Sequence, residues 1–238
     1  MRWPFVVLLL VLTLGGCAIE VVPGGPPPPA AGAATVEDTA AEDTVVDAVP
    51  AADNSDSRTG DERTAVQVVN AFWERWFADR GRRYVPPDVE GGYIGNRGPT
   101  CSGEPSVPGN AYYCPSQNFL AWDENLMRAG YTQIGDAWVY LVIAHEWGHA
   151  IQAQLPNRLV SQALELQADC LAGAALQGAA DQGLVRIEQG DEQEIAETLS
   201  AVADDYPWTD ESSHGDAQQR TSAFDQGVSG GVDSCLGR

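Results

Sequence analysis

From about residue 61 onward, apolar side chains recur at the three- and four-residue spacing of helices that bury one face. The first such segment runs from Asp61 to Asp79 and ends at Gly81, a residue type that commonly follows a helix C-terminus. Pro156 separates the next two segments, because proline cannot continue a helix. The pattern predicts further helices over about 136–154, 159–177, 191–203 and 216–226.

The region between the first two helices has a different pattern. Residues 84–114 contain many Gly and Pro residues, which is typical of short strands and turns. Residues 118–122 form a short run with the composition of a strand. We therefore predict an α+β domain with a small N-terminal sheet region and a helical C-terminal half.

The N-terminus carries an apolar segment of another kind. Arg2 precedes the run from Phe5 to Leu14, which as a helix would cover only about 15 Å, half the hydrocarbon thickness of a bilayer. Such a run is typical of a secretion signal. Leu14-Gly15-Gly16-Cys17 resembles the lipobox of bacterial lipoproteins, in which the cysteine is lipidated. We expect residues 1–17 to be a lipoprotein signal peptide and the protein to be exported and held at the outer face of the cell membrane. An ordinary signal peptide is the alternative.

Residues 18–62 differ in composition from the rest of the chain. They are rich in Pro, Ala and acidic residues, with ten acidic side chains and a single base, Arg58. Such a segment cannot bury enough apolar surface to offset the entropy of ordering. We expect a disordered tether, followed by one catalytic domain over residues 63–238. An acidic tail without a spacer role would have the same composition.

The charge balance excludes one class of partner. The chain has 13 basic and 34 acidic side chains, a formal net charge of −21, and every basic residue is arginine. A chain this acidic is repelled by phosphate backbones, so we expect no nucleic-acid partner.

Without the lipobox cysteine, four cysteines remain: Cys101, Cys114, Cys170 and Cys235. An even number in an exported chain indicates two disulfides, for which three pairings are possible. We favour Cys101 with Cys114, across a Gly/Pro-rich loop, and Cys170 with Cys235, which would join the C-terminus to a helix. A zinc–thiolate site is the alternative, although no C-x-x-C spacing is present.

Two of the three histidines lie in the sequence His145-Glu146-Trp147-Gly148-His149, an H-E-x-x-H motif. On a helix, side chains four residues apart project from the same face, so both imidazoles can bind one Zn²⁺ ion, with Glu146 beside the open coordination position. The neighbouring residues are strongly apolar, and buried His and Glu side chains need partners that a metal could supply.

A second helical segment provides carboxylates at the same spacing. Glu165 and Asp169 are four residues apart and share a helix face. A carboxylate from that face would complete a His₂Glu site, and an Asp one turn later can accept the remaining N–H of a ligating histidine.

This combination resembles the gluzincin metallopeptidases and, more closely, the bacterial "putative neutral zinc metallopeptidase" family. The resemblance covers most of the folded domain and implies a zincin-like catalytic domain. It implies zinc bound by His145, His149 and Glu165, with Glu146 catalytic, and it agrees with the favoured cysteine pairing. The matching blocks are Tyr113-Cys114-Pro115, residues 145–152, residues 165–173, and Ser213-His214-Gly215 with Gln219, Arg220 and Phe224.

The expected activity is that of a membrane-anchored zinc metalloendopeptidase acting on peptide or protein substrates. Zinc would activate a water molecule and Glu146 would act as general base. An oxyanion stabiliser is also needed. The candidate is His214, with Tyr206 and Arg220 behind it, although His214 could instead cap the following helix or act as a removable fourth zinc ligand. The strand over 118–122 could be the edge to which an extended substrate adds, or an ordinary core strand.

Two other function classes fit the same residues. One is a non-catalytic, zinc-stabilised binding or regulatory lipoprotein. The other is a zinc amidase that acts on cell-wall peptides.

Overall fold

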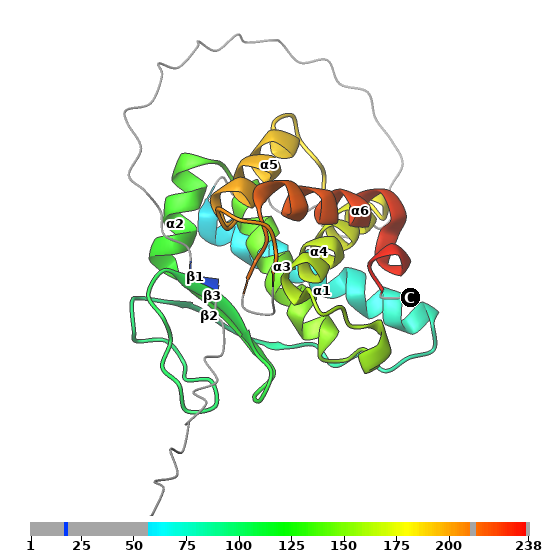
Figure 1. Ribbon diagram of the computed structural model, residues 1–238, viewed down its shortest axis with the longest axis horizontal. Coiled ribbons are helices and arrows are strands. Elements are labelled where there is room, and N and C mark those ends of the chain that lie inside the picture. The colour runs from blue at the N-terminus through cyan, green and yellow to red at the C-terminus, as the bar shows by residue number, and fades with distance from the viewer. Residues whose placement is uncertain (1–16, 19–56, 210–212, 237–238) are drawn as a thin grey trace, which may run out of the picture.

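The computed structural model describes residues 17–18, 57–209 and 213–236 (Figure 1). It is a mixed α+β fold in which helices predominate, as the sequence predicts. The rest of the expected signal peptide, and the expected tether up to residue 56, lie outside the described residues. The elements in chain order are β1 (Cys17–Ala18), α1 (Arg58–Asp79), β2 (Asp88–Tyr93), β3 (Asn110–Cys114), β4 (Phe119–Asp123), α2 (Glu124–Gln133), α3 (Ala137–Gln152), the short 3₁₀ helix η1 (Asn157–Leu159), α4 (Leu164–Asp181), α5 (Asp191–Ala201) and α6 (Ala217–Cys235).

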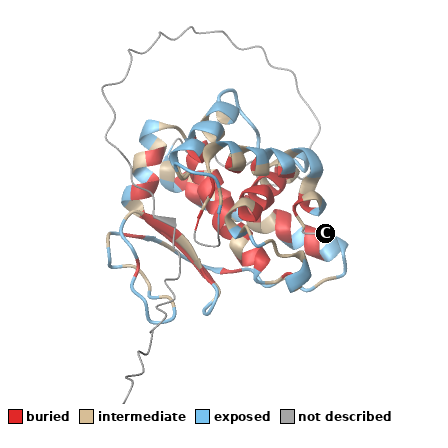
Figure 2. Ribbon diagram, viewed as in Figure 1, coloured by how far each residue is buried: buried red, intermediate tan, exposed pale blue. Residues whose placement is uncertain are grey.

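Helix α3 is the most deeply buried helix of the fold. All of its residues are buried except Tyr140 and His149. A helix that is apolar around most of its circumference must be covered on several sides, and here α1, α4 and α5 pack against it while α6 packs along α4. Figure 2 shows the buried positions gathered on α3 and α4 and the exposed ones on the outer faces of the surrounding helices. The H-E-x-x-H motif therefore lies on the central helix of the core.

The first helix begins earlier than predicted. Helix α1 starts at Arg58 rather than Asp61, so its first turn lies within the range expected to be tether. Ser57 is the N-cap, and its hydroxyl accepts a hydrogen bond from the backbone N–H of Gly60. A serine cap satisfies one of the free N–H groups of the first turn.

Helix α2 was not predicted. Its N-cap is Asp123, whose Oδ1 accepts a hydrogen bond from the backbone N–H of Asn125 at 2.8 Å. Only Leu126, Met127 and Gly130 are buried, which is too few for a recognisable apolar stripe. Gly130 lies so close to the Trp138 ring that a Cβ there would be 2.0 Å from it. The position of α2 thus depends on a tertiary contact with α3.

The sheet corrects one expectation about substrate binding. Its strand order is β1-β3-β4-β2, with β4 antiparallel to β3 and parallel to β2. Strand β4, which contains most of the predicted strand over 118–122, is therefore an interior strand, and all five of its residues are buried. Its backbone groups are paired on both sides, so it cannot be the edge to which a substrate adds. β1 pairs with the other side of β3, where Cys17 lies opposite Ala111.

Both predicted disulfides are present. Cys101 is bonded to Cys114 and Cys170 to Cys235, with Cα–Cα distances of 5.6 Å in each pair. The zinc–thiolate alternative is therefore wrong. Within the described residues, none of the helices combines the length and the hydrophobicity needed to cross a bilayer.

Close backbone contacts at glycines set the spacing of the helices that carry the motif. A Cβ at Gly148 on α3 would lie 2.9 Å from the carbonyl oxygen of Ala168 on α4. A Cβ at Gly227 on α6 would lie 1.9 Å from the carbonyl oxygen of Cys170, also on α4. Real Cβ atoms do not approach backbone oxygen this closely, so both crossings require glycine. They bring the face of α4 that carries Glu165 and Asp169 against α3.

Candidate metal centre

Three potential metal ligands meet where α3 packs against the start of α4. One donor atom from each of His145, His149 and Glu165 lies within 4.8 Å of the other two. His145 Nε2 is 3.1 Å from Glu165 Oε2, and His149 Nε2 is 3.5 Å from Glu165 Oε1. His145 is buried, whereas the side chains of His149 and Glu165 are partly exposed. The group is thus held by the core on one side and reachable from solvent on the other.

The tautomer of His145 is defined by Asp169. His145 Nδ1 lies 2.8 Å from Asp169 Oδ1. A carboxylate oxygen accepts hydrogen bonds, so Nδ1 carries the proton and donates. In the neutral imidazole, the lone pair is then on Nε2, which faces Glu165.

Arg220 holds Asp169 in its turn. The guanidinium Nε and Nη2 each donate to one carboxylate oxygen of Asp169 at 2.8 Å, and Nη1 donates to the carbonyl oxygen of Val202 at 2.7 Å. Burial alone raises the pKa of Asp169, but the charges of Arg220 and His145 outweigh it and lower the pKa below its usual value. Asp169 is therefore an anion inside the core, and it orients His145.

The tautomer of His149 is defined in a different way. Its Nδ1 lies 2.9 Å from Oε1 of Gln152, one turn further along α3. Both N–H groups of the Gln152 amide are directed to other acceptors, the carbonyl oxygen of Leu164 and Oε1 of Gln167. Oε1 of Gln152 is therefore the acceptor, and His149 donates from Nδ1. The i,i+3 spacing of His149 and Gln152 was visible in the sequence, but Gln152 was not predicted to be part of the site.

This arrangement calls for a cation. Both imidazoles present Nε2 to a carboxylate, and two lone pairs facing each other across about 3 Å repel unless a proton or a metal ion lies between them. Burial raises the pKa of Glu165, but the imidazoles of His149 and His145, when protonated, outweigh it and hold the pKa well below its usual range, so positive charge at this position stabilises the carboxylate anion. Two imidazole nitrogens and one carboxylate form a donor set that suits Zn²⁺ with one coordination position open. The residues present therefore fit a catalytic zinc ion.

Glu146 follows His145 on α3 and lies inside the fold. It is buried, at 3% exposure. With His145, Asp169, Thr198 and Arg220 it lines a cavity of about 30 Å³, which has room for a water molecule. Glu146 and a water-sized space thus lie next to one of the candidate ligands, His145.

The comparison with known proteins identifies the family. A sequence model of the family described as "Putative neutral zinc metallopeptidase" matches residues 6–157 and 154–236. The chain belongs to this family. Membership supports assignment as a zinc-dependent peptidase, and therefore as a hydrolase.

Two relatives of this family member come from strains of Escherichia coli, K12 and CFT073, and both carry the name "Uncharacterized protein YpfJ". Each is 30% identical over 187 residues, which cover 67% of this chain and 63% of the relative. The chain thus spans less than two thirds of the length of these curated relatives. No solved structure matches the chain significantly.

In this metallopeptidase-family chain, His214 is not one of the three grouped ligands and pairs with Asp204. Its Nδ1 lies 3.2 Å from Asp204 Oδ1, and its backbone N–H donates to Asp204 Oδ2 at 2.7 Å. The helix that follows is capped by Asp216, which forms a capping box with Gln219, so the expectation that His214 caps it is wrong. Tyr206, placed behind His214 from the sequence, is 54% exposed. Arg220, predicted to lie there too, instead pairs with Asp169.

Proposed function

We propose that this protein is an exported, lipid-anchored zinc metalloendopeptidase with a zincin-like catalytic domain. The observation that carries the proposal is the convergence of His145 Nε2, His149 Nε2 and the Glu165 carboxylate on one position, with the buried Glu146 next to His145 in sequence. When bound there, zinc supplies a Lewis acid that activates water and polarises a peptide carbonyl.

The residues of the chain then have separate tasks. His145, His149 and Glu165 hold the ion. Asp169 keeps the Nδ1 proton of His145 in place, and Arg220 keeps Asp169 charged and oriented. The Glu146 carboxylate accepts the proton of the attacking water and delivers it to the nitrogen of the leaving amine.

His214 is the proposed oxyanion stabiliser. Asp204 accepts from its Nδ1, which anchors the ring, so the donor to an oxyanion is the Nε2–H of the imidazolium form. A donor directed at the developing oxyanion contributes more in the transition state than in the ground state, which is the requirement for catalysis.

The proposed organisation places the catalytic domain, which begins with α1 at Arg58, behind a tether that ends before this helix and an anchor at Cys17. Two disulfides support an exported location, because such bonds persist in oxidising compartments. Metabolic labelling with a fatty acid tests the anchor. Wild-type protein should carry the label, and the Cys17→Ala variant should not. A labelled Cys17→Ala variant, or an unlabelled wild type, would contradict lipidation at this residue.

The decisive experiment is cleavage of an unbiased peptide library by wild-type and Glu146→Gln proteins, each zinc-loaded and chelated. Glu146→Gln should retain stoichiometric zinc, because Glu146 is not a ligand, while its rate falls about 10²–10⁴-fold through loss of the base. Equal peptide cleavage by the two proteins would refute the role of Glu146. A zinc-loaded wild type that cleaves cell-wall fragments but no library peptide would identify an amidase instead, and one that cleaves neither would be a binding protein.

A further inference from the structure

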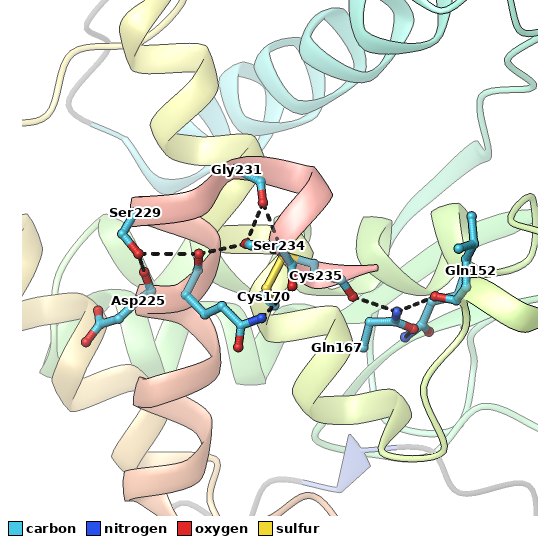
Figure 3. The surroundings of a disulfide bond; sticks show 10 residues. Gln152, Gln167, Cys170, Asp225, Ser229, Gly231, Ser234 and Cys235 are labelled. Carbon is cyan, nitrogen blue, oxygen red and sulfur yellow. Dashed lines mark hydrogen bonds between the residues drawn. A yellow bond between two sulfur atoms is a disulfide. The ribbon is translucent and has the colours of Figure 1, made fainter. Parts of the chain in front are cut away.

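Two buried glutamines connect the candidate metal centre to the C-terminal turn of the chain. Gln152 ends α3 and Gln167 lies on α4, and they are only 7% and 4% exposed. Figure 3 shows the two side chains lying between the end of α3 and Cys235. A buried primary amide has two donors and an acceptor that must all find partners, so these positions are costly unless the hydrogen bonds are complete.

The orientation of the Gln167 amide is set by the backbone. Its Nε2 donates to the carbonyl oxygens of Leu159 at 2.8 Å and of Cys235 at 2.9 Å. Its Oε1 accepts from the backbone N–H of Ser161 at 2.9 Å. Backbone groups cannot exchange donor and acceptor roles, so rotating this amide by 180° would lose all three bonds.

Gln167 in turn orients Gln152. Since Oε1 of Gln167 is an acceptor, the nitrogen of Gln152 must face it, at 3.2 Å. The same nitrogen donates to the carbonyl oxygen of Leu164 at 2.8 Å. Oε1 of Gln152 is thereby directed at Nδ1 of His149. A series of donor-to-acceptor bonds thus leads from His149 through two amides to the carbonyl oxygen of Cys235.

The end of this series is fixed covalently. Cys235 is bonded to Cys170, which follows Asp169 on α4. The disulfide therefore holds the acceptor of Gln167 against the same helix that supplies Glu165. It lies at the centre of Figure 3, with Gln167 on one side and the last turn of α6 on the other.

The two candidate zinc ligands on α3 are consequently held by different means. His145 donates to an anion, Asp169, whose charge is balanced by Arg220. His149 donates to a neutral amide. A neutral partner fixes the tautomer without adding charge, so the ligand set with Zn²⁺ keeps the net charge of about +1 that follows from two neutral imidazoles and one carboxylate.

We propose that Gln152 is a positioning residue of the metal centre, which fixes His149 as the Nδ1–H tautomer with Nε2 available to the metal, and that Gln167 and the disulfide-anchored carbonyl of Cys235 fix the amide of Gln152. This inference rests on the proposed function, because it assumes that His149 binds zinc. Residues that orient a metal ligand typically change metal affinity by about 10–100-fold when removed.

The test is zinc affinity, measured by competition with a chromophoric chelator on the full chain with its disulfides intact. Gln152→Leu should weaken zinc binding about 10–100-fold, and Gln167→Leu should weaken it in the same direction by a smaller factor. Gln152→Glu keeps an acceptor for His149 and should bind zinc more tightly than Gln152→Leu. The matched control is Gln177→Leu, the same change at a surface residue of α4 that pairs with Asp181. Its zinc affinity should equal that of the wild type.

A measurement on the wild type covers the case in which a leucine variant does not fold. ¹⁵N-histidine NMR of the zinc-loaded protein should show the His149 proton on Nδ1 and the metal on Nε2. Metal bound through Nδ1 of His149, or wild-type zinc affinity in Gln152→Leu, would overturn the inference alone. Stoichiometric zinc without peptide cleavage would overturn only the proposed activity, whereas absence of zinc binding by the wild type would overturn both.

Discussion

Arg220 and Asp169 form a two-point ion pair in the interior of the protein, 51 residues apart in sequence. Nε and Nη2 of Arg220 each lie 2.8 Å from an oxygen of Asp169. Asp169 is 0% exposed and Arg220 is 3% exposed. Two charges removed from water in this way are stable only as long as both are present.

Asp169→Asn should therefore destabilise the protein strongly. It leaves Arg220 charged and buried without a counterion, and breaking such a pair typically costs about 3–5 kcal/mol. Urea unfolding of the chelated protein measures the change without a contribution from zinc. Asp233→Asn is the control, because Asp233 pairs with Arg80 at the surface at 3.5 Å and its loss should cost less than about 1 kcal/mol. Similar losses in the two variants would contradict the role assigned to the buried pair.

His214→Ala distinguishes the two roles still open for His214, which are oxyanion stabiliser and fourth zinc ligand. If His214 stabilises the oxyanion, kcat should fall about 10²–10³-fold while zinc affinity stays at the wild-type value. Peptide cleavage assays and chelator competition on the same preparation provide both numbers. A loss of zinc affinity parallel to the loss of kcat would instead identify His214 as a fourth ligand, and an unchanged kcat would refute the oxyanion role.

Gly227→Ala tests the close crossing of α6 and α4. Alanine favours a helix over glycine by about 1 kcal/mol, so propensity alone predicts stabilisation. The added Cβ would lie 1.9 Å from the carbonyl oxygen of Cys170, however, and the backbone there cannot rotate away. We expect the clash to dominate, with a net loss of about 2 kcal/mol or more in urea unfolding. Gly230→Ala on the same helix meets Ser234 Cβ at 2.6 Å rather than a backbone carbonyl oxygen at 1.9 Å, so it should cost less than Gly227→Ala.

Glu62 should give the stability a pH dependence near neutrality. Burial raises the pKa of Glu62 to about 7 from 4.5, and the charge of Glu124 adds to the rise, while Arg58 opposes it. The folded state thus binds this proton more tightly than the unfolded state, so the contribution of Glu62 to stability should be largest below about pH 4.5 and should be lost as pH rises to about 7. The full shift corresponds to about 3 kcal/mol, and solvent screening around the Arg58 pair should reduce the effect to about 1–2 kcal/mol.

Glu62→Gln removes this titration and should flatten the fall in unfolding free energy between pH 5 and pH 7. The slope is obtained from urea unfolding at a series of pH values. Glu192→Gln, at an exposed position of α5, should leave the slope as it is in the wild type. A Glu62→Gln protein with the wild-type slope would contradict the role assigned to Glu62.

Several features could be predicted from the sequence because they depend on local geometry. Helical spacing alone places His145 and His149 on one face, and Glu165 and Asp169 on another. The pairing of Cys101 with Cys114, favoured among three possible pairings because it closes a short Gly/Pro-rich loop, is confirmed. The α+β composition and most helix ranges follow from the spacing of apolar residues. That spacing did not predict the first turn of α1 or any part of α2.

Other features were decided only when distant segments came together. β4 is an interior strand because β2 and β3 both pair with it, and no property of residues 119–123 requires two partners. Arg220 reaches Asp169 rather than His214 because α6 crosses α4 where glycines allow close approach. Local spacing determined which side chains point the same way, because helix geometry repeats over a few residues. The packing of α3, α4 and α6 determined which of these side chains meet, because contacts between helices depend on the whole folded chain.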